Sequence, residues 1–306
     1  MTAAFTGVEG GAAAVDFLPD SDAPSLGFVV SAPREGGLDV FNLDGELLTR
    51  HAGARLSGIA TAPGFQLRGE PLPLIFGASS DSSSVLGYAV VRDGAQIFDL
   101  PLQPTEAADG VAGLCLLREG PGFVELVVLG TGASAEIWRV RDAGEDVLSI
   151  EQQRSFDLPA PARACTSFDG DIYTASPAGG VSRIGPDGTV LAETSTPVTS
   201  LTVGEFSGAR VLLATNGSSD MIESFDARTL NARGPIDIVD GLSTPGIERP
   251  GVIAVSPANF GYTAYARGML AVYDNDDQRL KVVSNDAFAR AVVSAAPATT
   301  DANEAG

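Results

Sequence analysis

The run Asp274-Asn275-Asp276-Asp277 is the densest group of carboxylates in the chain. Carboxylate oxygens are the hard ligands that Ca²⁺ prefers, and alternate residues of a turn can face one ion. Asp274, Asp276 and Asp277 therefore form a candidate calcium site. The run lacks the Gly and the distal Glu of an EF-hand loop. More often such a run is an exposed hairpin turn whose charges prevent a sheet edge from pairing with another chain.

Other residue types that carry out catalysis are rare. The chain has one histidine, His51, and two cysteines, Cys115 and Cys165. These numbers are too small for the usual zinc sites, and they argue against a Ser/His nucleophile. No two carboxylates show a spacing that supports general acid–base catalysis, so we assign no catalytic residues.

The chain is strongly acidic, with 39 acidic and 19 basic residues among 306 and a net charge of −20. Nucleic acids and anionic membranes both require a basic surface, so we expect neither as a partner. No apolar stretch is long enough for a transmembrane helix, and the first residues do not form a signal sequence. We expect a monomer without membrane insertion. The excess of carboxylates is compatible with binding of divalent cations.

A strand-and-turn pattern recurs six times, at residues 38–45, 86–94, 137–144, 181–188, 222–229 and 270–277. Spacings of 49, 50, 44, 41 and 48 residues separate its apolar anchors, which are Phe41, Val90, Val140, Ile184, Phe225 and Tyr273. A period of about 40–50 residues that holds several strands is typical of a β-propeller blade. We therefore predict an all-β fold, a single six-bladed β-propeller with about four antiparallel strands per blade. Pairing of N-terminal and C-terminal strands would close the ring.

The repeat also sets the expected domain boundaries. Residues 12–293 are predicted to form the propeller. Residues 1–11 are small, Gly-rich and without period, which predicts a flexible N-terminus, and residues 294–306 have the composition of a disordered tail. Residues 285–293 fit either one helical turn or a closing strand. In the last blade we expect residues 262–266 to pair with residues 269–273.

The two cysteines fall at similar places in the repeat. Cys115 lies before the anchor Val140, and Cys165 lies before the anchor Ile184. Both are therefore expected on inner strands of adjacent blades. The pattern favours two unpaired, buried small side chains, because free cysteine is among the most buried residue types. A disulfide that joins the two blades is the alternative.

Several short segments carry a family resemblance, and they occur in the same order along the chain. Residues 34–45, REGGLDVFNLDG, resemble the first-blade signature of the β-propeller phytases. Later segments resemble further strands of that family, at residues 55–59, 113–116, 164–165, 200–203 and 280–284. The resemblance covers about residues 25–292. It implies a six-bladed propeller, and an extracellular or periplasmic location.

The resemblance also implies an activity, the calcium-dependent hydrolysis of phosphomonoesters of phytate at one mouth of the channel. Phytate is a dense polyanion that a carboxylate-rich site repels. Calcium reverses the local charge, polarises the phosphoryl oxygen and supplies an activated water. Calcium is therefore the cofactor that the resemblance implies.

This chain departs from the family at most of the site positions. They hold Ala60, Asp81 or a neighbouring Ser, Ala112, Arg163, Ser176-Pro177, Pro197, Thr199, Pro250 and Ile253. Arg163 replaces a Glu and so reverses the charge. Arg34 stands in place of a phosphate-binding Lys, and Asn216 stands in place of a Gln ligand. Losing nearly all the carboxylates removes the calcium cluster that neutralises the substrate.

Three arginines are the candidates that remain. Arg34, Arg163 and Arg249 fall on or next to site positions of the family. Guanidinium groups that converge at the channel mouth can hold an anion directly, without calcium. The alternative is that they are solvated loop residues paired with nearby acids. With Asn216, they form the predicted anion-binding set.

The predicted function is that of a phytase-like propeller with little or no phosphatase activity. It would bind a phosphorylated small molecule or a protein partner. The alternative is an active calcium-dependent phosphomonoesterase of the 3-phytase type. A third hypothesis is a propeller that only binds proteins and has an inert channel.

Overall fold

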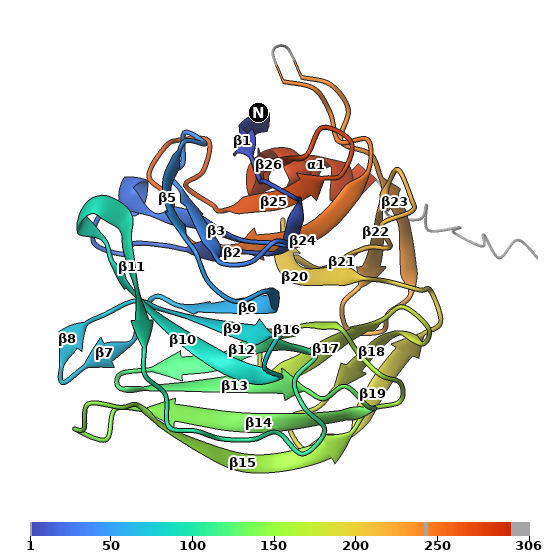
Figure 1. The fold of residues 1–306 in the computed structure, drawn as a ribbon. Helices are drawn as coiled ribbons and strands as arrows, with labels where there is room; N and C mark the ends of the chain where they lie inside the picture. The colour runs from blue at the N-terminus through green and yellow to red at the C-terminus, as the bar shows by residue number, and fades with distance from the viewer. Residues whose placement is uncertain (1, 242–243, 295–306) are drawn as a thin grey trace, which may run out of the picture.

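The computed structural model describes residues 2–241 and 244–294. Six four-stranded antiparallel sheets, the blades, are arranged in a ring (Figure 1). The first strands of the blades, β2, β6, β12, β16, β20 and β24, contact one another in that order, and β24 contacts β2 again. They surround the central channel. The prediction of a six-bladed propeller with four strands per blade is confirmed.

The strands follow the chain from the inside of each blade to the outside. Blades 1 and 2 consist of β2 (Ala12–Leu18), β3 (Phe28–Pro33), β4 (Leu38–Phe41) and β5 (Leu47–His51), then β6 (Leu56–Ala62), β9 (Leu74–Ser79), β10 (Ser84–Val91) and β11 (Gln96–Leu100). Blades 3 and 4 consist of β12 (Gly113–Gly120), β13 (Phe123–Leu129), β14 (Ser134–Arg141) and β15 (Ser149–Asp157), then β16 (Ala164–Phe168), β17 (Asp171–Ser176), β18 (Gly180–Ile184) and β19 (Val190–Thr194). Blade 5 consists of β20 (Ser200–Phe206), β21 (Ala209–Thr215), β22 (Ile222–Asp226) and β23 (Ala232–Ile236). The small additional elements are the hairpin β7 (Gln66–Leu67) and β8 (Glu70–Pro71), and the 3₁₀ turns η1 (Pro24–Leu26) and η2 (Asp93–Ala95).

Apolar side chains fill the spaces between neighbouring blades. Six buried clusters form the core, one at each of the six blade–blade contacts. Successive side chains of a strand point to opposite faces of its sheet, so a strand inside a blade is buried on both faces. Every residue of β3 and β9 is buried accordingly, whereas the outermost strand β5 has only half-buried and exposed residues.

Blade 6 takes strands from both ends of the chain. It consists of β24 (Pro250–Ser256), β25 (Met269–Asp274), β26 (Arg279–Ser284) and, outermost, β1 (Thr2–Gly7). Thr2 pairs with Val283, and Phe5 is buried against Phe41 of blade 1 at 5.7 Å between ring centroids. The prediction of a flexible N-terminus over residues 1–11 is therefore wrong for β1, which closes the ring.

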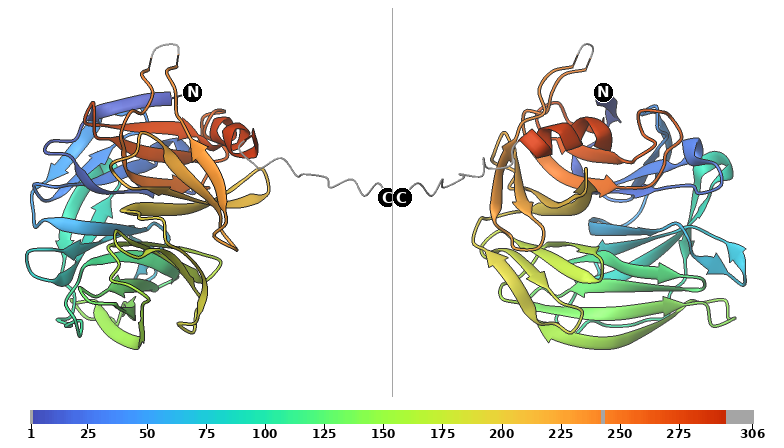
Figure 2. Two further views of the ribbon diagram at one scale, coloured as in Figure 1. Left: turned by 90° about the vertical axis from the view of Figure 1, so that its right-hand side faces the viewer. Right: turned by 180° about the vertical axis from the view of Figure 1, so that it is seen from behind.

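The end of the sheet is followed by the helix α1 (Asn285–Ser294) (Figure 2). Of the two alternatives predicted for residues 285–293, the helical one is therefore correct and the closing strand is not. Phe288 of α1 packs against Phe206, the last residue of β20, with 5.3 Å between the ring centroids. The predicted tail, residues 294–306, lies outside the described residues except for Ser294. In the described part of the chain, no helix is long and apolar enough to cross a membrane.

Two local predictions are corrected by the structure. Residues 262–266 form a turn, and the partner of β25 is β24. Cys115 of β12 and Cys165 of β16 form a disulfide, with 5.6 Å between their Cα atoms. The favoured interpretation of two unpaired cysteines is therefore wrong, although their expected positions on inner strands of adjacent blades are correct. The disulfide joins blade 3 to blade 4 at the channel.

Candidate functional site: a channel with two chambers of opposite charge

The channel holds two cavities that meet at its middle. The cavities on its two sides share five lining residues, one from each of five inner strands: Val15, Ile59, Cys165, Leu201 and Ile253. We call the side where the inner strands begin the upper chamber, and the side where they end the lower chamber. The apolar side chains between them separate two sites whose chemistry differs.

The upper chamber is lined by arginines. It comprises a cavity of about 230 Å³ and an adjoining cavity of about 440 Å³ that share Ala13, Thr199, Ser200 and Val252. Arg34 and Arg249 line the larger cavity, and Arg163 lines the smaller one. No other charged residue lines either cavity. The structure thus brings the three predicted arginines to one mouth of the channel.

The loops between strands position these arginines. Arg34 follows β3, and its Nε donates to the carbonyl of Ala12 at 3.2 Å. Arg249 precedes β24, and its Nη2 donates to the carbonyl of Asn275 at 3.1 Å. Arg163 precedes β16 and has an exposed side chain. The carbonyl contacts fix Arg34 and Arg249 and leave their positive charges available.

Few carboxylates approach the three arginines. Arg249 Nε lies 3.9 Å from Asp276 Oδ1, a loose and exposed pair. No ion pair within residues 2–241 and 244–294 involves Arg34 or Arg163. The alternative interpretation, in which nearby acids neutralise the arginines, therefore applies only weakly and only to Arg249.

Asn216 lies beside the arginine site but belongs to its own turn. Its Oδ1 accepts hydrogen bonds from the backbone amides of Ser218 and Ser219, at 2.9 Å and 2.7 Å. The next residue, Gly217, lines the upper chamber, whereas Asn216 does not. The structure gives Asn216 a role in shaping the loop.

The acidic run at the end of β25 is an ion-pair cluster around a lysine. Lys281 Nζ lies 2.8 Å from Asp274 Oδ2 and 2.7 Å from Asp277 Oδ2, and the Lys281 and Asp274 side chains are both 1% exposed. Lys281 also donates to the carbonyl of Gly246. Asp276 points instead to Arg249. A protein ammonium group thus occupies the place between carboxylates where calcium was predicted.

The same cluster shapes the upper mouth. Asp274 accepts the backbone amides of Glu248 and Arg249, at 3.2 Å and 3.1 Å. Burial raises the pKa of Asp274, but the Lys281 ammonium and these amides outweigh it and hold the pKa below its usual value. Among the described residues, no group of three or more His, Cys, Asp or Glu side chains could hold a metal ion. The geometry therefore does not support calcium binding by Asp274, Asp276 and Asp277.

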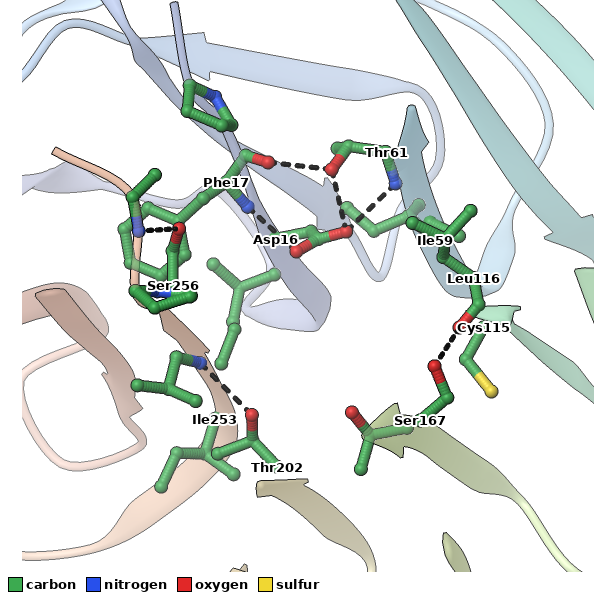
Figure 3. Close-up of a pocket in the computed structure, with 18 of the residues that line it drawn as sticks. Asp16, Phe17, Ile59, Thr61, Cys115, Leu116, Ser167, Thr202, Ile253 and Ser256 are labelled. Carbon is green, nitrogen blue, oxygen red and sulfur yellow. Dashed lines mark hydrogen bonds between the residues drawn. The ribbon is translucent and has the colours of Figure 1, made fainter. Parts of the chain in front are cut away.

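The lower chamber has the opposite charge. Its cavity of about 530 Å³ is lined by two ionisable side chains, Asp16 and Glu119, and by no lysine, arginine or histidine. Figure 3 shows Asp16 and Thr61 across the open space from Thr202 and Ser167. The motifs and spacings of the sequence single out neither acid. The available signal was a single Asp within the apolar strand β2, AAAVDFL.

Asp16 accepts hydrogen bonds but has no cationic partner. Its Oδ1 accepts the backbone amide of Phe17 at 2.8 Å, and its Oδ2 accepts that of Thr61 at 2.9 Å. The carboxyl lies deep among protein atoms, although the channel keeps it partly accessible to solvent. Burial raises the pKa of Asp16 to about 6, against the opposing effect of these hydrogen bonds.

Replacing Asp16 by Asn should change how stability depends on pH. A group whose pKa rises on folding stabilises the protein below its unfolded pKa, and this contribution is lost as pH rises through the folded pKa. The free energy of unfolding of the variant, relative to wild type, should therefore increase by up to about 3 kcal/mol as pH rises through the window from 3.8 to about 6. Urea unfolding of both proteins across this window measures it. If the free energies of unfolding of variant and wild type differ by the same amount at every pH, the pKa of Asp16 does not change on folding.

Comparisons with known proteins support the fold and identify no function. No family model and no curated protein matches the chain. An auxiliary nutrient binding protein from Bacteroides thetaiotaomicron is similar, with a TM-score of 0.55 and 10% identity over 90% of this chain and 69% of that chain. The β-propeller domain of Cps50 (Swd1) from Myceliophteria thermophila is similar with a TM-score of 0.53 and 11% identity, over 93% of this chain and 99% of that domain. The WD40 β-propeller domain of Doa1 is similar with a TM-score of 0.52 and 13% identity, over 92% of this chain and 94% of that chain. At such identities the similarity establishes a β-propeller and nothing finer.

Proposed function

We propose that this chain is a non-catalytic propeller that binds a phosphorylated small molecule in the upper chamber. The observation that carries the proposal is the lining of that chamber, in which every charged residue is an arginine. Arginine presents a planar fork of N–H donors that matches phosphate oxygens, and its charge persists at any physiological pH. The molecule has a net charge of −20, so it repels anions except where such a group of arginines is exposed.

Hydroxyl groups supplement the arginines. The Oγ of Ser200 accepts the backbone amide of Ile253 at 3.1 Å, so its own O–H can donate to a ligand. Ser200 lines both upper cavities. A phosphate held between Arg34 and Arg249 would thus meet neutral as well as charged donors.

The resemblance to β-propeller phytases supports the same mouth of the channel. Arg34, Arg163 and Arg249 fall on or next to the site positions of that family, and the family's acids are mostly replaced. We therefore propose descent from such an enzyme, with arginines taking over the charge compensation that calcium supplies there. The alternative, a calcium-dependent phosphomonoesterase, is disfavoured because no carboxylate lines the upper chamber to hold the metal or act as a base.

We also propose that the protein is located outside the cytosol. Disulfides form and persist mainly in oxidising compartments such as the periplasm or the extracellular space. The Cys115–Cys165 disulfide supports the location that the phytase resemblance implies.

Calorimetric titration with inorganic phosphate and with phytate, in the presence of a chelator, tests the binding proposal. We expect wild type to bind, and we expect the double variant Arg34→Ala/Arg249→Ala to bind at least about 100-fold more weakly, because each hydrogen bond to a charged group contributes about 1.5–3 kcal/mol. Arg228→Ala is the matched control. Arg228 is exposed and lines neither upper cavity, so this variant should bind as wild type does.

Two outcomes would contradict the proposal. Equal binding by wild type and the double variant would show that the arginines do not form the site. Release of phosphate from phytate on addition of calcium would show that the protein is an enzyme, and the calcium-dependent alternative would replace the proposal.

A further inference from the structure

The lower chamber is a second cavity of ligand size at the opposite end of the channel. Its volume of about 530 Å³ falls within the range of about 300–1,000 Å³ that is usual for small-molecule sites. A further cavity of about 440 Å³ adjoins it at the lower mouth, and the two share Pro19, Pro63, Glu119 and Ala258. Solvent and small molecules can therefore reach the chamber from this end.

One edge of the lower chamber carries its negative charge. Asp16 accepts the backbone amide of Thr61 at 2.9 Å, and Glu119 accepts that of Gly64 at 3.2 Å. These two amides are three residues apart at the end of β6. Both carboxylates are therefore held against the same strand end, on one side of the cavity. Their places are fixed by backbone bonds, independently of any ligand.

Neither carboxylate has a cationic partner in the described part of the chain. Arg92 and Arg118 form ion pairs with other acids. Arg92 Nε lies 3.2 Å from Asp20 Oδ2, and Arg118 Nε lies 2.6 Å from Glu125 Oε2. Burial accordingly raises the pKa of Glu119 as it does that of Asp16. The chamber thus holds two acids without a compensating charge.

The other side of the chamber is apolar, with hydroxyl groups. Leu201, Ile253 and Val255 supply the apolar surface on β20 and β24. Thr202 Oγ1 accepts the backbone amide of Val255 at 3.1 Å, and Ser167 Oγ donates to the carbonyl of Leu116 at 2.7 Å (Figure 3). A ligand in this chamber would meet carboxylates on one side and hydrocarbon on the other.

We propose that the lower chamber binds a small organic cation, an amine with a short apolar body, whose ammonium group lies against Asp16 and Glu119. An anion would be repelled by both carboxylates. A neutral molecule would leave two half-buried acids without a counter-charge, which is unfavourable in surroundings less polar than water. A hard metal ion requires more oxygen ligands than two side chains provide. An amine supplies the missing charge and covers the apolar wall.

The proposal predicts a defined pH dependence. The ammonium group attracts the ionised form of Asp16, whose pKa in the free protein is about 6. Affinity should therefore be constant well above that pH and fall by about tenfold for each unit below it. Near pH 6, binding should release protons, because the cation lowers the pKa of the acid. β3 and β6, which flank Asp16, carry no ionisable side chain, and Glu119 is the one other such group lining the chamber.

Three probes of one carbon skeleton test the proposal: n-butylammonium, 1-butanol and butyrate, each titrated calorimetrically into the full chain at constant ionic strength. We expect n-butylammonium to bind well above pH 6 and to lose affinity below it, and we expect the alcohol and the carboxylate not to bind. Equal affinity for n-butylammonium and 1-butanol would overturn the proposal, as would absence of n-butylammonium binding. These experiments use wild type and do not depend on the upper chamber.

Variants locate the site. Asp16→Asn and Glu119→Gln should each weaken n-butylammonium binding by about tenfold or more, the size expected for loss of one charged hydrogen bond. Asp22→Asn is the matched control, because it removes one negative charge from the same end of the channel without lining the chamber. Circular dichroism melts confirm folding. If folded Asp16→Asn and Glu119→Gln bind as wild type does, the amine binds elsewhere and the proposal fails.

Discussion

Lys281→Met should destabilise the protein by about 3–5 kcal/mol, because it leaves a buried carboxylate without its counter-charge. Asp274 and Lys281 are both almost completely buried and 2.8 Å apart. Met fills much of the space of the lysine stem but supplies neither the charge nor the hydrogen bond to Gly246. Denaturant unfolding at neutral pH measures the effect. The loss should shrink as pH falls, since protonation of Asp274 removes the uncompensated charge.

Arg279→Met is the matched control for this variant. It removes a positive charge from the same strand, β26, at an exposed position, and it should change stability by less than about 0.5 kcal/mol. Lys281→Met should also weaken phosphate binding, because Asp274 holds the backbone of Arg249 through a 3.1 Å hydrogen bond. Equal stability of the two variants would mean that the buried cluster is not needed.

Removing the disulfide should have an effect of similar size. Cys115→Ala/Cys165→Ala opens a covalent link between residues 50 positions apart. The chain-entropy relation for a loop of this length gives a loss of about 4 kcal/mol. Thermal or denaturant unfolding of the double variant measures it. The linked blades contact each other through a buried cluster that should persist, so the variant should still fold into the ring.

Reduction of wild type provides the comparison for the disulfide variant. Wild type treated with a reductant should unfold at the same denaturant concentration as Cys115→Ala/Cys165→Ala, and the variant itself should not respond to the reductant. A variant as stable as oxidised wild type would show that the disulfide does not stabilise this fold.

The sequence determines the propeller through its repetition. Each blade requires the same apolar strand ends and turns, so six copies at steps of 41 to 50 residues predict six blades. Closure of the ring by pairing of N-terminal and C-terminal strands is confirmed, but the sequence did not show that residues 2–7 form the closing strand β1, for a physical reason. Its residues are small and show no period, and its partner Val283 is far away in the sequence, so no local pattern reports the pairing. The disulfide was similarly undecidable, because the repeat places both cysteines on neighbouring strands but does not give their distance.

The candidate site was only partly predictable. Arg34, Arg163 and Arg249 were selected through a resemblance, and the structure places them around one mouth. The run at residues 274–277 is the hairpin turn that its composition favoured, but the calcium hypothesis has no support, because sequence shows where acids lie and not what lies between them. The hairpin β25–β26 brings Lys281 into that space. Asp16 and Glu119 are far apart in the sequence and belong to different blades, so only the closed ring reveals that they share a chamber.

The closing strand determines when the ring can be completed during synthesis. β1 leaves the ribosome before every other strand of the ring, but its partner β26 is among the last strands made. During that interval the blade 6 side of the core around Phe5 is missing, and β1 has no strand partner for its backbone groups. A nascent chain interrupted before Arg279 lacks β26, so both β1 and β25 are left with an unpaired strand edge. Such incomplete products would depend on chaperones and proteases until β26 has been synthesised and has paired with β1.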